Sequence, residues 1–412
     1  YYHDRSRGRS PSDFFYALVD GDDLLADLAV GRLPVENTQQ ARDAVEKLIR
    51  YDSDPEPGDW RSRVIYLANF HEKNLFTGPS DSLATHYTEP IGLNSVKIYN
   101  PDDSGIPNPT GKAYIDAFNQ GALLVNYSGH GSVGTMQPVF DLTTADFDYF
   151  SQVRNDGRQP LVLAFSCLNG LFIHPQDHLL SLGEAFTRKG DGGAIAYISA
   201  ASKSFIAQND FLGDRLFNQF FKDGNLEFGP ALNTAKAQVL AAYPSWLTVV
   251  LTMQLFGDPV QQLALPQVAD YTALSLRVGT DPVFVHSTQI VEATLQNNTR
   301  LTADSLTVIV LGYAEASARP ETLFYATQES FAGIEDFSFA WPVRERRGSY
   351  RLELVLDPED RVAELYEHNN SLQLDLEILE PLIPTTVFPA ANAMLPVQDL
   401  VLEAAVPTAG AA

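Results

Sequence analysis

Two apolar runs decide how this chain can be interpreted: residues 121–132 read GALLVNYSGHGS, and residues 160–172 read PLVLAFSCLNGLF. The apolar part of each run is too short for a helix and is apolar on both faces, which is typical of a strand inside a parallel sheet. Each run follows a segment with helical character, residues 110–120 and residues 143–152. The order helix, strand, helix, strand predicts that the two strands are parallel neighbours.

A histidine and the only cysteine of the chain each follow one of these runs. If the strands are adjacent, His130 and Cys167 both lie at the carboxyl edge, where open α/β sheets place their sites. A thiol with a pKa of about 8.5 is mostly protonated at neutral pH, and a neighbouring imidazole that favours the thiolate turns it into a strong nucleophile. Glycines beside His130 allow close backbone approach, and the Gly131 amide is a candidate oxyanion donor. The pattern predicts a Cys-His dyad.

Other interpretations of these residues stay open. A lone cysteine after an apolar run is more often a small buried hydrophobe, and a lone histidine in a turn is more often structural. His174 and His178 have the spacing of two zinc ligands on a helix, but Pro175 lies between them and no cysteine is near. We therefore predict no metal ligand and no required cofactor, with a zinc hydrolase or His174 as the base as minor alternatives. Acidic turns such as residues 101–105 are explained as well by solvation as by structural calcium.

The two motifs resemble those of the gingipain-type cysteine peptidases, whose caspase-like α/β fold carries histidine and cysteine in these contexts. Residues 20–52 resemble the family's strand, Gly-Arg turn and helix block, and LFGDP at residues 255–259 resembles the end of its catalytic domain. The resemblance covers about residues 13–265. It implies that Cys167 attacks the scissile carbonyl, that His130 transfers the proton, and that backbone amides at Gly131 and Cys167 stabilise the oxyanion.

The resemblance also suggests further site residues. In the loop that we expect after a strand at residues 62–69, Glu72 is in position to orient the catalytic histidine, and Asp81 is in position to bind a basic substrate side chain. Ser199 and Ser202 follow the predicted buried strand in GAIAYISAAS and would line the same carboxyl edge. Met136 stands where the family often has an aromatic residue.

The resemblance implies a secreted or cell-surface bacterial cysteine endopeptidase that acts on proteins or peptides through a thioester. A sortase-like transpeptidase would use the same residues, and a non-catalytic caspase-like scaffold for binding is the alternative of another class. The chain has 52 acidic and 28 basic residues, so its net charge of −24 disfavours nucleic acid as a partner. No apolar run is long enough to span a membrane. A pro-segment or a cell-surface anchoring region outside this chain is expected.

The domain organisation follows from a change of pattern near residue 266. We expect residues 1–35 to finish an amino-terminal subdomain and residues 36–265 to form the caspase-like domain, with its last helices at residues 230–242 and 245–256. Short alternating segments then recur between turn residues, which predicts an all-β sandwich over residues 266–380. Residues 355–376 resemble bacterial immunoglobulin-like adhesion-related modules, which implies an immunoglobulin-like sandwich. Residues 381–412, which are rich in proline and alanine, are expected to be a linker or the truncated start of a further β domain.

Overall fold

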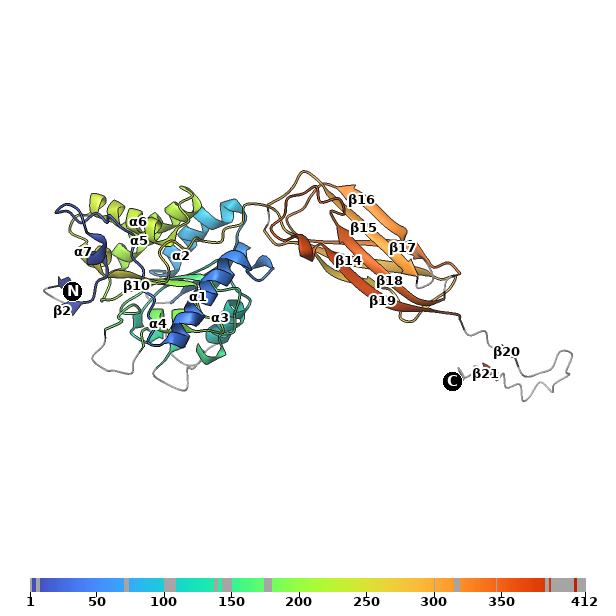
Figure 1. Cartoon of the computed structure of the whole chain (residues 1–412), viewed down its shortest axis with the longest axis horizontal. Helices are drawn as coiled ribbons and strands as arrows, with labels where there is room; N and C mark the ends of the chain where they lie inside the picture. Colours follow the sequence, from blue (N-terminus) through green and yellow to red (C-terminus); the bar gives the residue numbers. More distant parts are fainter. Residues whose placement is uncertain are drawn as a thin grey trace. The chain divides into compact units, whose positions relative to one another are not determined.

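The computed structural model describes residues 2–4, 8–69, 74–99, 109–136, 140–142, 150–173, 180–299, 301–314, 319–345, 347–381, 385–386 and 404–405. The chain forms two compact units (Figure 1). The first contains residues 1–270 and 298–301, and the second contains residues 271–297 and 302–412.

The first unit is built on a six-stranded sheet with the strand order β11, β10, β9, β5, β3, β4. Its strands are β3 (Arg63–Ala68), β4 (Asn94–Tyr99), β5 (Leu124–Ser128), β9 (Leu161–Phe165), β10 (Ala196–Ala200) and β11 (Met253–Phe256). Strands β10, β9, β5, β3 and β4 are parallel, and β11 runs antiparallel to β10. The prediction that the two motif strands, β5 and β9, are parallel neighbours is confirmed.

Helices cover both faces of this sheet (Figure 1). They are α1 (Thr38–Ser53), α2 (Thr77–Leu83), α3 (Pro109–Asn119), α4 (Leu182–Arg188), α5 (Ile206–Phe221), α6 (Phe228–Ala242) and α7 (Leu247–Thr252). Alternate strand residues point to opposite faces, so Leu124 packs in the core with α5 and α6 while Val125 packs in the core with α3 and α4. Burial on both faces explains the continuous apolar runs of the sequence.

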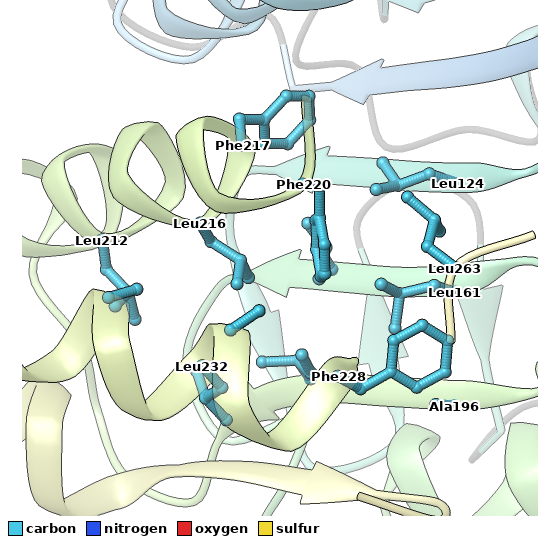
Figure 2. Close-up of a cluster of buried hydrophobic side chains, with 14 of the residues drawn as sticks. Leu124, Leu161, Ala196, Leu212, Leu216, Phe217, Phe220, Phe228, Leu232 and Leu263 are labelled. Atoms are coloured by element: carbon cyan, nitrogen blue, oxygen red, sulfur yellow. The ribbon is translucent and has the colours of Figure 1, made fainter. Parts of the chain in front are cut away.

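The larger core lies under α5 and α6. In Figure 2 the side chains of Leu216, Phe220 and Phe228 gather in one cluster with Leu161 and Leu124 of the sheet. All five are at most 1 % exposed. Fully burying side chains of this size contributes roughly 1.5–3 kcal/mol each, so this packing holds α5, whose first turn borders the carboxyl edge of the sheet, firmly in place.

The structure corrects two expectations for local structure and leaves most of a third untested. The helix expected at residues 245–256 ends at Thr252, and residues 253–256 form the antiparallel edge strand β11. Short apolar runs do not distinguish a helix from a strand, and pairing with β10 decides this one. The segment around Asp81, which was expected to be a loop, is helical. Asp81 lies within α2, and α2 continues into a π-helical turn (Ala84–Thr88). Most of the helix expected at residues 143–152 lies outside the described residues, and Phe150–Gln152 is a 3-10 turn.

The second unit is a sandwich of two sheets. One sheet contains β12 (Tyr271–Val278), β14 (Thr288–Asn297) and β17 (Gly333–Pro342); the other contains β13 (Val283–Phe284), β19 (Ser371–Leu379), β18 (Gly348–Leu356), β15 (Leu306–Ala314) and β16 (Glu321–Gln328). All neighbouring strands are antiparallel except β13 and β19. Side chains such as Val291, Leu295 and Leu354 are fully buried, which confirms the predicted all-β, immunoglobulin-like sandwich.

Candidate active site

The register of the sheet brings the two motifs to one edge. Ser128, the last residue of β5, is the neighbour of Phe165, the last residue of β9. His130 and Cys167 therefore each lie two residues beyond the same point of a parallel strand pair. The prediction that both motifs end at the carboxyl edge of the sheet is confirmed.

Glycine at position 131 makes the close contact between the two motifs. A methyl group on Gly131 would lie 2.9 Å from Ser166 Oγ and 3.1 Å from the Cys167 carbonyl oxygen. Atoms this close to a Cβ would have to move, so any larger residue would push the histidine segment away from the cysteine turn. Gly129 is constrained in the same way, because its added methyl would lie 2.5 Å from the Tyr127 hydroxyl.

The turn that carries Cys167 is strained and firmly held. Leu168 has a φ of +64°, which is unusual for a branched side chain. The Leu168 N–H donates to the Ser202 carbonyl at 3.1 Å, and the Gly170 N–H donates to the Ala200 carbonyl at 3.0 Å. The end of β10 thus fixes the turn from behind, while the cysteine side chain remains partly exposed.

The Cys167 sulfur has a backbone donor within reach. The Ser204 N–H donates to Sγ at 3.4 Å, and the Ser204 carbonyl lies 3.7 Å from the same sulfur. The Ser204 hydroxyl donates to the Ser166 carbonyl at 3.1 Å, which ties the two segments together a second time. Sequence reasoning missed Ser204, because 37 residues separate it from Cys167.

His130 is exposed but has defined neighbours. The ring of Phe76, which lies just before α2, meets the imidazole edge to face with a centroid separation of 5.2 Å and an angle of 78°. Phe76 itself is only 2 % exposed. The Tyr127 hydroxyl donates to the His130 carbonyl oxygen. Phe76 therefore limits how the imidazole can turn, and nothing in its local sequence marks it for that position.

Asn169 joins the two motifs through its side chain. It is fully buried, its Nδ2 donates to the carbonyls of Ser132 and Thr135, and its Oδ1 accepts from Ser166 Oγ. Asn169 lies two residues after Cys167, and its local sequence gives no sign of these contacts. Two of its three partners, Ser132 and Thr135, are 37 and 34 residues away, so only the folded chain reveals those contacts.

The structure places the two serines behind the site. Ser199 is fully buried in β10, and a methyl group on Gly170 would lie 2.7 Å from its hydroxyl oxygen. Ser202 is 3 % exposed and uses its carbonyl to hold Leu168. Neither hydroxyl faces solvent in this structure, so their direct contact with substrate stays a prediction.

Of the two predicted acidic residues, the structure describes Asp81. Asp81 lies on α2, accepts a hydrogen bond from the Tyr99 hydroxyl at 2.8 Å and pairs with Lys97 Nζ at 3.1 Å. Burial, together with the bond to Asp81, raises the pKa of Tyr99. Glu72 lies outside the described residues, so its role as the orienting acid stays a prediction.

No metal site emerges from the part of the chain that the structure describes. Within it, no three histidine, cysteine or acidic side chains gather as metal ligands would. His174 and His178 lie outside the described residues. Among the described helices, none has the length and apolar character needed to cross a bilayer.

Comparisons with known proteins agree with this arrangement. Residues 1–264 match the family model described as peptidase family C25. The chain is 24 % identical over 341 residues to gingipain R1 of Porphyromonas gingivalis and 26 % identical over 264 residues to gingipain R2 of the same organism. These alignments cover 73 % and 60 % of this chain but 33 % and 34 % of the relatives, so the chain spans about a third of their length.

Solved structures show the same fold. The crystal structure of the Arg-specific cysteine proteinase gingipain R (RgpB) matches with a TM-score of 0.55 and 18 % identity, over 89 % of this chain and 79 % of that one. A complex of the pro- and mature domains of P. gingivalis RgpB matches with a TM-score of 0.53, also at 18 % identity, over 89 % and 81 % of the two chains. With its caspase-like sheet, its two motifs at one edge and a family match over residues 1–264, the chain belongs to peptidase family C25.

Proposed function

We propose that this protein is a cysteine endopeptidase in which Cys167 is the nucleophile and His130 the general base and acid. The observation that carries the proposal is the contact of Gly131 with the Cys167 turn, at an edge where β5 and β9 end together. It brings a partly exposed thiol and an exposed imidazole to neighbouring segments, as nucleophilic catalysis requires.

The reaction would proceed by acyl transfer. The Cys167 thiolate attacks the scissile carbonyl carbon, and the carbonyl oxygen takes up the negative charge. The imidazolium of His130 gives its proton to the departing amine, which leaves a thioester on sulfur; water, deprotonated by His130, then releases the acid and restores the thiol. The Gly131 and Cys167 amides are the proposed oxyanion donors. In support, none of the described residues accepts a hydrogen bond from the Cys167 N–H.

We propose further that Asp81 binds a basic residue on the amino side of the cut bond, with Ser199 and Ser202 shaping the pocket. The relative whose structure is described as Arg-specific supports a basic substrate. Lys97 now neutralises Asp81, so a substrate cation would have to displace Lys97 from the carboxylate. Glu72 remains the proposed residue that orients His130.

We also propose that the protein acts outside the cell and is made with a pro-segment. Family membership supports the first point, and a solved complex of pro- and mature domains of RgpB supports the second. Adding a separately produced upstream segment from the same precursor should inhibit the chain, whereas an unrelated segment of equal length should not.

The experiment that tests the peptidase proposal compares the chain with its Cys167→Ala and His130→Ala variants on a proteome-derived peptide mixture, with every new terminus read by mass spectrometry. We expect cuts only with the unsubstituted chain. An amine acceptor joined to the new carboxyl ends would identify transpeptidation instead. If the wild-type chain cuts nothing and its thiol resists alkylation, the non-catalytic scaffold is correct.

The same assay tests the pocket. The Asp81→Asn variant should lose cuts after arginine and lysine, while Asp116→Asn, which removes an exposed carboxylate paired with Lys112, should keep them. Unchanged cleavage after basic residues in Asp81→Asn would contradict the role of Asp81.

A further inference from the structure

Asn169 makes contacts that use both the donors and the acceptor of its amide group. An amide group offers two N–H donors and one acceptor oxygen. Its Nδ2 donates to the Thr135 carbonyl at 2.8 Å and to the Ser132 carbonyl, and its Oδ1 accepts from Ser166 Oγ at 2.5 Å. The side chain is fully buried. A carboxylate would present a charge and no donor to two carbonyl oxygens, and an apolar side chain would remove all three hydrogen bonds.

These contacts join the two halves of the proposed site. Ser132 and Thr135 belong to the hairpin of β6 (Gly131–Ser132) and β7 (Thr135–Met136), which begins directly after His130. Ser166 directly precedes Cys167. The Asn169 amide therefore spans from the histidine hairpin to the cysteine turn, and a methyl on Gly131 would lie only 3.1 Å from its nitrogen.

The first turn of α4 supports the same junction. The Leu182 N–H donates to the Val133 carbonyl at 2.9 Å, and the Gly183 N–H donates to the Asn169 carbonyl at 3.0 Å. One helix end thus holds the hairpin and the turn at the same time. A capping box formed by Ser181 and Glu184 fixes this helix end. The first turn of α4 is therefore a backbone link between the two segments, and the Asn169 amide is the side-chain link beside it.

We propose that Asn169 is a positioning residue that holds the His130 hairpin in register with the Cys167 turn. The inference rests on the proposed function. Removing the bridge lets the hairpin move relative to the turn, and a displacement of about 1 Å at a reacting pair can cost on the order of a hundredfold in rate. The loss should fall on kcat, because the contact is made between enzyme groups and not with substrate.

Asn169→Asp tests this proposal, because it keeps the shape of the side chain and removes both donors. We expect kcat to fall at least tenfold with KM changed less than threefold. We also expect the rate of thiol alkylation at pH 6 to fall toward that of His130→Ala, because an imidazole out of register no longer favours the thiolate. Ser166→Ala, which removes only the donor to Asn169 Oδ1, should change both quantities in the same direction but less.

Asn155→Asp is the matched control. Asn155 is also fully buried, and its amide exchanges two hydrogen bonds with the backbone of Gly193. It precedes β9 and therefore lies away from the carboxyl edge. The Asn155→Asp variant should have a lower free energy of unfolding but keep the wild-type rate of thiol alkylation and the wild-type kcat.

Two outcomes would overturn the positioning role of Asn169 while leaving the proposed function in place. In the first, Asn169→Asp and Ser166→Ala fold and keep the alkylation profile and kcat of the wild-type chain. In the second, Asn155→Asp changes both quantities as much as Asn169→Asp, so that general destabilisation explains the effect. If the wild-type chain itself shows no His130-dependent alkylation, the proposed function fails and takes this inference with it. An active wild-type chain with an unaffected Asn169→Asp variant refutes the positioning role alone.

Discussion

The backbone N–H of Ser204 donates a hydrogen bond to the sulfur of Cys167 at 3.4 Å. Ser204 follows β10, and Cys167 follows β9, so the contact crosses between the ends of two adjacent parallel strands. A backbone donor is fixed by the fold and needs no reorientation when charge develops on sulfur. This relationship ties the reactivity of the thiol to the end of a third strand.

Replacing Ser204 by proline should lower the reactivity of the Cys167 thiol. Proline removes the N–H that reaches Sγ, so we expect alkylation of Cys167 near pH 6 and kcat/KM for peptide cleavage both to fall severalfold. Ser204→Ala is the control, because it keeps the N–H and loses only the hydroxyl bonds to Ser166 and Asn209. Equal effects in the two variants would mean that the hydroxyl, and not the backbone donor, matters.

Replacing Phe76 by leucine should let the imidazole of His130 turn more freely. The edge-to-face ring contact is worth roughly 0.5–1.5 kcal/mol, so kcat should fall by about two- to tenfold with little change in KM. Phe118→Leu breaks a similar contact with Phe186, at 5.5 Å and 73°, in the core on the α3 and α4 face. That variant should lose stability without a comparable loss of kcat, and steady-state kinetics on one peptide substrate distinguish the two.

Replacing Arg32 by lysine should destabilise the first unit. The Arg32 guanidinium makes two hydrogen bonds of 2.7 Å to Asp13 and lies 4.0 Å above the ring of Phe172. A lysine reproduces neither the fork nor the stacking, and the loss should be about 1–3 kcal/mol in urea unfolding. Arg50→Lys changes an exposed pair with Asp156 and should cost less than about 1 kcal/mol. Equal losses of unfolding free energy in the two variants would show that the Arg32 contacts stabilise the unit no more than the exposed pair does.

Lys236 makes the stability of the first unit depend on pH. It is 4 % exposed, and burial lowers the pKa of Lys236 to about 7. In the unfolded chain the pKa is about 10.4, so between pH 7 and 10 the unfolded state binds more protons. The free energy of unfolding should therefore rise with pH through this window, by up to a few kcal/mol, and the contribution should be lost as pH falls to about 7.

Lys236→Met tests this contribution. The stability of the variant relative to the wild-type chain should be most favourable near pH 7 and should decline toward pH 10, as followed by urea midpoints. Lys112→Met, which alters an exposed side chain, should show no such trend. A constant difference between Lys236→Met and the wild-type chain would contradict the prediction.

The sequence by itself determined the two motif strands and the proposed catalytic pair. The apolar runs at residues 123–126 and 161–165 predicted parallel neighbours, because strands buried on both faces need such runs. Asn37 is a residue type typical of a helix N-cap, and its side chain accepts from the Gln40 N–H at 3.0 Å at the start of α1. His130 and Cys167 were placed at one edge because each directly follows a strand. All of these signals are local, so they can be found in the order of the residues.

Only the tertiary structure decided which distant residues contact the two motifs that carry the proposed pair. Phe76, Asn169 and Ser204 act on partners between 34 and 54 residues away in the chain, and no local pattern encodes such contacts. Strand β11 was missed for the same reason, because its apolar run suits a helix until it pairs with β10. Periodicity reports which side of an element is buried, whereas packing and register determine what it is buried against.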